Sequence, residues 1–122
     1  MSQTTLPARV LVVEDEWLIA DFVQEMLEGA GYHVTGPVAR VSQALKLIEQ
    51  GGLDAAVLDV NLATEKSYPI AYVLAERSIP FLFVTGYVTP DMPDNLKHRP
   101  VLSKPIDGAA LVSLLGGILE KK

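Results

Sequence analysis

Short apolar runs alternate along the chain with segments whose apolar residues recur at helical spacing. Apolar runs of about four to eight residues are typical of buried strands, and a period near 3.6 is typical of helices. The runs predict strands at Arg9–Glu14, His33–Val38, Ala55–Asp59, Pro80–Thr85 and Val101–Ser103. Strand–helix alternation without hairpin signals predicts an α/β fold, with right-handed crossovers and one doubly wound, five-stranded parallel sheet.

The segments between these strands are predicted to be helices that cover both faces of the sheet. Gly31 lies just past the first helix and Gly51 just past the second, where glycine commonly ends a helix. Residues 62–68 are predicted to be a loop, and Pro69 suits the first turn of the third helix. Asp107 is expected to cap the last helix, whose apolar stripe is expected to pack on the sheet.

The segment after the fourth predicted strand is unusual for a helix. Thr89 and Pro90 suit the start of a short helix, but Pro93 would disrupt the helix interior if it falls past the first turn. Proline inside a helix costs about 3 kcal/mol, because it lacks an N–H and clashes with the preceding turn. The sequence therefore predicts a fourth helix that is short or mobile.

Length and composition bound the class of protein. The 122 residues fit a single domain spanning residues 1–122. The net charge is −5 without a cluster of basic residues, which argues against a nucleic-acid partner, and the lack of cysteine excludes disulfides and zinc–thiolate sites. The polar N-terminus does not resemble a signal peptide, and no uncharged segment approaches the ~20 residues of a membrane span. We therefore expect a cytoplasmic protein with no membrane partner.

Carboxylates stand at the ends of two strongly apolar runs. Glu14 and Asp15 follow the first run, and Asp59 ends the third. The carboxyl ends of parallel strands meet at one edge of a sheet, where like charges repel each other unless a cation neutralises them. Mg²⁺ is the usual cation where carboxylates share a site with phosphate, so the sequence predicts a magnesium site.

Two further polar residues stand at strand ends. Thr85 closes the fourth predicted strand and Lys104 follows the fifth. Each alone is weak evidence, since threonine is a good strand former and a lone lysine is usually a solvated surface charge. Together with the acids on successive strand ends, they indicate one site that holds an anion beside a metal.

These motifs resemble the receiver domain of two-component response regulators, over a core of residues 9–119. The matching motifs are Val12–Glu16, Leu58–Leu62, Phe83–Gly86 and Ser103–Pro105. The segment Pro80–Tyr87 also resembles the PFxFATGY signature of a subgroup of often stand-alone receivers, with Val84 in place of its alanine. The resemblance implies a flavodoxin-like, CheY-like (βα)₅ sandwich with strand order 2-1-3-4-5.

The resemblance also implies roles around the metal. Asp59 would be the phosphoacceptor and a metal ligand. Asp15 would bind Mg²⁺ directly, and Glu14 directly or through water. The backbone carbonyl of Asn61 would supply another ligand.

On the phosphoryl side, Lys104 would pair with one oxygen and the Thr85 hydroxyl would donate to another. Pro105 would follow a cis peptide bond, which only X–Pro bonds adopt cheaply. Most receivers carry an aromatic switch residue where this chain has Val101, so the usual toggle is not expected. Tyr87 is an alternative signalling aromatic or a packing residue.

Three other predictions concern structural roles. Glu16 is expected to stabilise the N-terminus of the first helix. Trp17 is expected to pack against the protein, with lining the acid site as the alternative. Glu65 and Lys66 are expected to form a solvated pair in a loop.

The preferred interpretation is a single-domain response regulator that is not an enzyme acting on a separate substrate. A sensor histidine kinase or a histidine phosphotransfer protein would phosphorylate it, and an unidentified downstream protein or phosphate draining would provide output. A flavodoxin-like cofactor binder is disfavoured, because acids occupy the first strand-to-helix turn where a phosphate-cradling loop is needed. A haloacid-dehalogenase-like phosphatase is disfavoured because Asn61 stands where its second aspartate would be.

Overall fold

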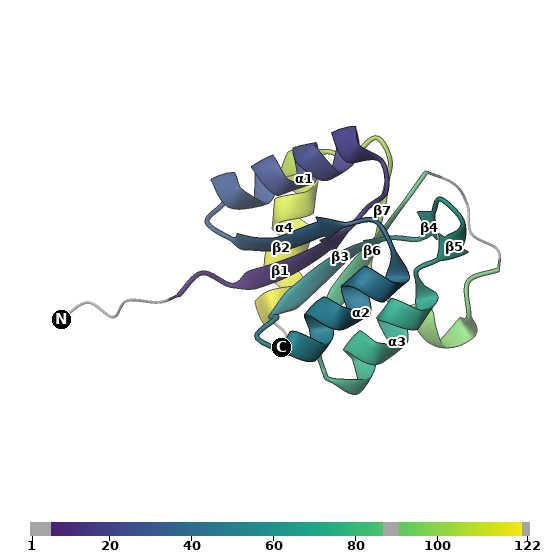
Figure 1. Cartoon of the computed structure of the whole chain (residues 1–122). Coiled ribbons are helices and arrows are strands. Elements are labelled where there is room, and N and C mark those ends of the chain that lie inside the picture. The colour runs from purple at the N-terminus through teal and green to yellow at the C-terminus, as the bar shows by residue number, and fades with distance from the viewer. Residues whose placement is uncertain (1–5, 87–90, 121–122) are drawn as a thin grey trace.

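The computed structural model describes residues 6–86 and 91–120, and it contains one five-stranded parallel sheet. Its strands are β1 (Arg9–Val13), β2 (His33–Val38), β3 (Ala55–Asp59), β6 (Phe81–Thr85) and β7 (Val101–Ser103). The order across the sheet is β2-β1-β3-β6-β7 (Figure 1). This is the predicted order 2-1-3-4-5, counted over the strands of this sheet. No described helix is long and apolar enough to cross a membrane.

Helices cover both faces of the sheet, as predicted. The helices are α1 (Trp17–Gly29), α2 (Val41–Gln50), α3 (Tyr68–Glu76) and α4 (Gly108–Glu120). The core between the sheet and α1 and α4 includes Val10 and Val12 of β1. The core on the other face, under α2 and α3, includes Leu11 and Val13. The strand is therefore buried on both sides, which explains its unbroken apolar run.

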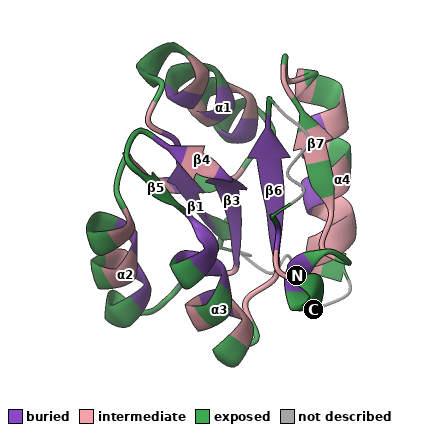
Figure 2. Cartoon of the chain, turned by 90° about the vertical axis from the view of Figure 1, so that its right-hand side faces the viewer, coloured by how far each residue is buried: buried purple, intermediate pink, exposed green. Residues whose placement is uncertain are grey.

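Burial is deepest in the middle of the sheet. The central strands β1, β3 and β6 are coloured as buried almost throughout in Figure 2, whereas the edge strand β7 is partly exposed. Val101 on β7 is 43% exposed and belongs to neither core cluster. The stripe on α4 packs on the sheet as predicted, with Leu111 and Leu115 fully buried.

The predicted loop at residues 62–68 contains a small hairpin instead, and this prediction was wrong. Strands β4 (Asn61–Leu62) and β5 (Glu65–Lys66) pair antiparallel. A carboxylate oxygen of Glu65 accepts a hydrogen bond at 2.9 Å from the backbone N–H of Val41, the first residue of α2. Glu65 therefore fixes the hairpin to a helix N-terminus and is not merely solvated. Strands of two residues are too short to leave a periodic signal in the sequence.

The segment before β7 contains a single 3₁₀ turn, η1 (Asp94–Leu96), in the described residues between β6 and β7. The prediction of a short fourth helix is confirmed for these residues, and its mobility stays a prediction. Leu96 and Met92 of this segment are buried in the same core as residues of α2 and α3. The predicted helix start at Thr89 and Pro90 lies outside the described residues.

Asp107 caps α4 as predicted. Its Oδ1 accepts hydrogen bonds from the backbone N–H groups of Ala109 at 2.9 Å and Ala110 at 3.2 Å. We expect Asp107→Ala to lower the free energy of unfolding by about 1 kcal/mol, because two N–H groups of the first turn lose their acceptor. Urea unfolding measures this, and Asp107→Asn, which keeps an acceptor oxygen, should lie within a few tenths of a kcal/mol of wild type. Equal losses for both variants would contradict the capping role.

Candidate functional site

The three predicted acids meet at the carboxyl edge of the sheet. Strands β1 and β3 are adjacent and parallel, with Val13 opposite Leu58, so the residues that follow them lie side by side. Carboxylate oxygens of Glu14, Asp15 and Asp59 all lie within 4.8 Å of one another. Glu14 and Asp59 are 6% and 3% exposed, while Asp15 is half-buried. The convergence predicted from the two apolar runs is confirmed.

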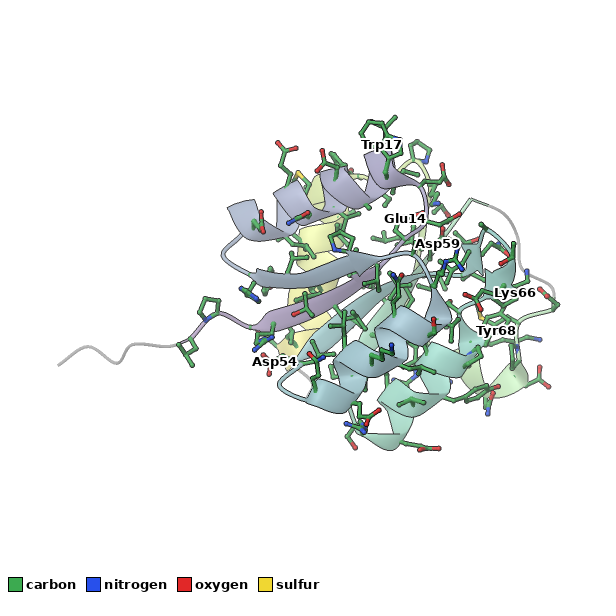
Figure 3. All side chains as sticks on the ribbon, in the orientation of Figure 1. Glu14, Trp17, Asp54, Asp59, Lys66 and Tyr68 are labelled. Atoms are coloured by element: carbon green, nitrogen blue, oxygen red, sulfur yellow. The ribbon has the colours of Figure 1, made fainter. Side chains whose placement is uncertain are left out.

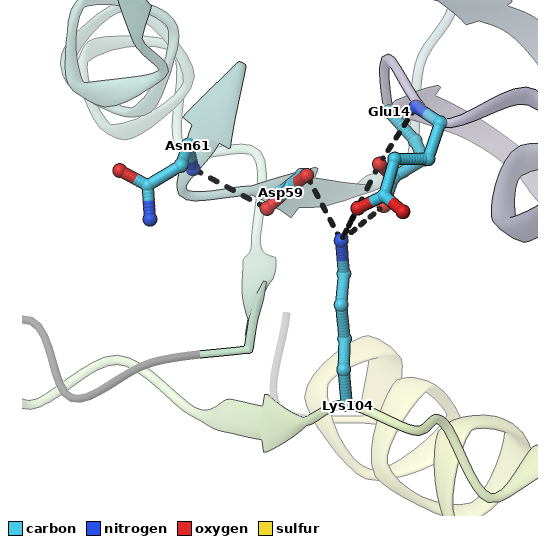
Figure 4. A network of polar contacts seen from close by, with 5 residues as sticks. Glu14, Asp59, Asn61 and Lys104 are labelled. Atoms are coloured by element: carbon cyan, nitrogen blue, oxygen red, sulfur yellow. Dashed lines mark hydrogen bonds and ion pairs between the residues drawn. The ribbon is translucent and has the colours of Figure 1, made fainter. Parts of the chain in front are cut away.

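Lys104 reaches into this cluster from the loop after β7 (Figure 4). Its Nζ lies 2.9 Å from a carboxylate oxygen of Glu16, 3.2 Å from Asp59 Oδ2 and 3.3 Å from Glu14 Oε1. The backbone N–H of Lys104 also donates to the Thr85 carbonyl at 2.9 Å, which ties β7 to the end of β6. One ammonium group thus lies among three carboxylates from two segments of the chain.

The electrostatics of the cluster show a shortage of positive charge. Burial, followed by a hydrogen bond and repulsion from Asp59, raises the pKa of Glu14 from 4.5 to about 8. Burial would lower the pKa of Lys104, but its contacts with Glu16, Asp59 and Glu14 more than offset this and raise it. Lys104 therefore stays charged, but its single positive charge is not sufficient to keep Glu14 ionised at neutral pH.

Glu16 lies at the start of α1, and its predicted stabilisation of that helix N-terminus by charge stays a prediction. It stands at the N-cap position, but its side chain makes no capping hydrogen bond. Its carboxylate pairs with Lys104 instead, while its backbone N–H donates to Glu14 Oε2 at 3.1 Å. The sequence contained a signal for this, since Glu16 directly continues the acid pair. The missing information was the position of a lysine far along the chain.

Asn61 connects the acid cluster to the hairpin. Its backbone N–H donates to Asp59 Oδ1 at 3.3 Å, and its side-chain oxygen accepts a short hydrogen bond from Lys66 Nζ. Lys66 Nζ also lies 3.6 Å from Asp91 Oδ2, in the segment before η1. Glu65 and Lys66 are both exposed, as predicted, but their polar partners are Val41 for Glu65 and Asn61 and Asp91 for Lys66. The Asn61 carbonyl as a metal ligand stays a prediction.

The remaining predicted residues lie around the same edge. Thr85 ends β6 and is buried. The bond between Lys104 and Pro105 is cis, as predicted. Tyr87 lies outside the described residues. Trp17 was expected to pack but is 74% exposed at the start of α1, where Figure 3 shows it pointing away from the protein.

A cavity of about 420 Å³ opens beside the cluster. Asp59, Asn61, Gly86, Lys104, Glu16, Ile19 and Pro105 line it. It therefore presents the Asp59 carboxylate and the Lys104 ammonium side by side to an incoming group. The volume lies within the range of small-ligand sites, roughly 300–1,000 Å³.

The donor set fits a hard divalent cation. Three carboxylates converge within one coordination sphere, and the described chain offers only oxygen ligands there. The raised pKa of Glu14, caused first by burial and then by Asp59, shows that its ionised form lacks a compensating positive charge, which such a cation would supply. Glu14, Asp15 and Asp59 would hold Mg²⁺ in this arrangement.

Comparisons with known proteins agree with this geometry. A sequence model of the response regulator receiver domain matches residues 10–115. SdrG from Sphingomonas melonis Fr1 is 41% identical, and its solution structure superposes with a TM-score of 0.83 over 95% of this chain and 99% of that one. The BeF3-activated conformation of SdrG from Pseudomonas melonis Fr1 is 42% identical and superposes with a TM-score of 0.77, over 91% of this chain and 95% of that one.

A more distant relative is longer. The transcriptional regulatory protein PdtaR of Mycobacterium tuberculosis is 25% identical over 96% of this chain, which spans only 58% of the length of PdtaR. The likeness to the PFxFATGY subgroup stays a prediction. The matched segment contains β1, β3, β6 and β7 with all the residues of the acid cluster and Lys104. This chain belongs to the family of response regulator receiver domains.

Proposed function

We propose that this protein is a single-domain response regulator that accepts a phosphoryl group on Asp59 from a phosphohistidine, with Mg²⁺. The observation that supports this most directly is the cluster of Glu14, Asp15 and Asp59, with Lys104 Nζ 3.2 Å from Asp59 Oδ2. A sensor histidine kinase or a histidine phosphotransfer protein would be the donor. Output would come from contacts with a downstream protein or from draining phosphate from a shared kinase.

The transfer brings two anions together, so neutralisation and positioning supply most of the catalysis. An Asp59 oxygen attacks phosphorus, the N–P bond of the phosphohistidine breaks, and the histidine leaves with the bonding electrons. Lys104 stabilises charge on the phosphoryl oxygens beside Asp59. Mg²⁺, when bound, would offset the combined negative charge of the carboxylates and the phosphoryl group.

Phosphorylation adds about −1.5 to −2 of charge and three acceptor oxygens at Asp59. Lys104 already lies at ion-pair distance from Asp59 and from Glu16, so the new charge draws it from Glu16 towards the phosphoryl group. Thr85, at the end of β6, would donate its hydroxyl. The existence of a BeF3-activated conformation of SdrG supports an activated state of this chain, because BeF₃⁻ is an analogue of a phosphoryl group.

Incubation with a histidine-phosphorylated phosphotransfer domain tests the proposal. We expect one phosphate per chain, stable in acid and labile to hydroxylamine, with Mg²⁺ and little with EDTA. Multiple turnover of phosphate esters without a labelled intermediate would favour the phosphatase alternative. No labelling from a panel of phosphohistidine donors, including small phosphodonors, would contradict the proposal.

The Glu16 contact leads to a second expectation. Glu16 is exposed and competes with the incoming phosphoryl group for Lys104. Glu16→Gln should therefore raise the rate of phosphorylation by about two- to fivefold, the range expected for a single solvent-exposed ion pair. Glu49→Gln, on the exposed surface of α2, removes the same charge away from the site and should leave the rate unchanged. An unchanged or lower rate for Glu16→Gln would show that Glu16 does not compete.

A further inference from the structure

A second cavity, of about 540 Å³, lies at the opposite end of the sheet from Asp59. Its walls come from the end of α3, the start of β6, the segment before β7 and the last turn of α4. The lining residues are Ala75, Ser78, Ile79, Pro80, Phe81, His98, Arg99, Pro100 and Ile118. Since Phe81 begins β6 and Asp59 ends the neighbouring β3, the cavity is separate from the proposed phosphoacceptor site.

The charge of this cavity is opposite to that of the protein. The chain carries a net charge of −5, yet among the described residues no Asp or Glu lines the cavity. Arg99 supplies a permanent positive charge, and His98 and Ser78 add an imidazole and a hydroxyl. A cavity with apolar walls and one uncompensated positive charge attracts anions.

Arg99 is held in place but makes no ion pair among the described residues. Its guanidinium carbon lies 4.5 Å from the centroid of the Phe81 ring, in a cation–π contact. Its Nε is buried without a hydrogen-bond partner within residues 6–86 and 91–120. A guanidinium that packs on a ring through one face keeps its in-plane N–H groups for an acceptor, and its planar fork matches a carboxylate.

The rest of the cavity is mainly apolar. Ile79, Pro80, Pro100 and Ile118 form walls around the mouth, next to the ring of Phe81. Ser78, with a φ of 58°, ends α3 in a left-handed cap in which the Ile79 N–H donates to the Leu74 carbonyl at 2.9 Å, and this cap places its side chain at the cavity. A concave apolar site with a few converging polar groups is the usual architecture for small organic ligands.

We propose that this cavity binds a small organic carboxylate whose charged group pairs with Arg99 and whose apolar body contacts Ile79 and Ile118. Inorganic phosphate lacks the apolar body and a neutral amide lacks the charge, so both should bind much more weakly. This site goes beyond the proposed phosphotransfer and does not depend on it.

Titration of ¹⁵N-labelled full-length protein with benzoate tests the site. We expect saturable shifts at the amides of Ser78, Ile79 and Phe81 and at the Arg99 side-chain N–H, with Kd of about 1 mM or lower. Benzamide and inorganic phosphate should give no saturation at about 20 mM, twentyfold above that Kd. Arg99→Gln should weaken benzoate binding at least about tenfold, as loss of a charge-assisted pair requires.

Two variants separate the role of the Arg99 guanidinium from the effect of changing the net charge of the protein. Lys97→Gln removes an exposed cation two residues away that does not line the cavity, and should change Kd less than about twofold. Arg99→Lys keeps the charge without the planar fork and should bind with intermediate affinity. Unchanged affinity in a folded Arg99→Gln, absence of saturable shifts with benzoate, or equal binding of phosphate would each overturn the proposal.

Discussion

Replacing Asp59 with Asn is expected to abolish phosphate incorporation from a phosphohistidine donor. The carboxamide is neutral and a poor nucleophile, and it leaves no carboxylate to form the acyl phosphate. Glu14 and Asp15 do not line the cavity beside Lys104. Glu16 lines it but lies outside the cluster that would hold Mg²⁺, so none of these acids is expected to substitute. Acid-stable, hydroxylamine-labile label should fall to background while the labelled donor remains intact.

A matched control lies at the other end of the same strand. Asp54 precedes β3, and its Oδ2 accepts a hydrogen bond from the backbone N–H of Arg9 at 2.8 Å (Figure 3). Asp54→Asn keeps an acceptor oxygen and removes the same charge, so labelling should stay at the wild-type level. Retained labelling in a folded Asp59→Asn would refute the assignment of the phosphoacceptor.

The acid cluster at the edge of the sheet could be predicted from short segments of sequence. Each buried strand is visible as an apolar run, and parallel strands bring the residues at their ends together. Four apolar residues followed by Asp59 predicted a strand at Ala55–Asp59, and β3 has these bounds. The first strand follows the same logic, although β1 ends at Val13, one residue before the predicted end. Once both strands are parallel neighbours, Glu14 and Asp59 have little freedom to lie apart.

The pairings around that edge could not be predicted. Lys104 and Glu16 are 88 residues apart in the chain, and only the packed fold brings them together. Lys66 likewise gains Asn61 and Asp91 as partners through a hairpin that left no periodic signal. Whether a helix residue such as Trp17 is exposed depends on how the helix is rotated about its axis against the sheet. The spacing of apolar residues in the sequence gives this rotation only approximately.

The affinity for Mg²⁺ is expected to rise steeply with pH, and Glu14 is the reason. Its pKa is about 8 in the metal-free protein, and a carboxylate must lose its proton before it binds a metal. The apparent Kd for Mg²⁺ should therefore fall about tenfold between roughly pH 6 and pH 7, and level off above about pH 8. Calorimetry in buffers of different ionisation heat should show about one proton released per Mg²⁺ below pH 7, and almost none above pH 9.

The stability of the metal-free protein should follow the opposite trend. The raised pKa means that the folded protein binds a proton at Glu14 more tightly than the unfolded chain does. The contribution of Glu14 to stability is therefore fully present below pH 4.5, the ordinary pKa, and is lost as pH rises towards about 8. Glu14→Gln cannot ionise, so it should flatten both trends, raise the stability of the metal-free protein at pH 8 and weaken Mg²⁺ binding. An Mg²⁺ affinity in wild type that does not change from about pH 6 to 8 would show that Glu14 is already ionised, and that Lys104 alone neutralises the cluster.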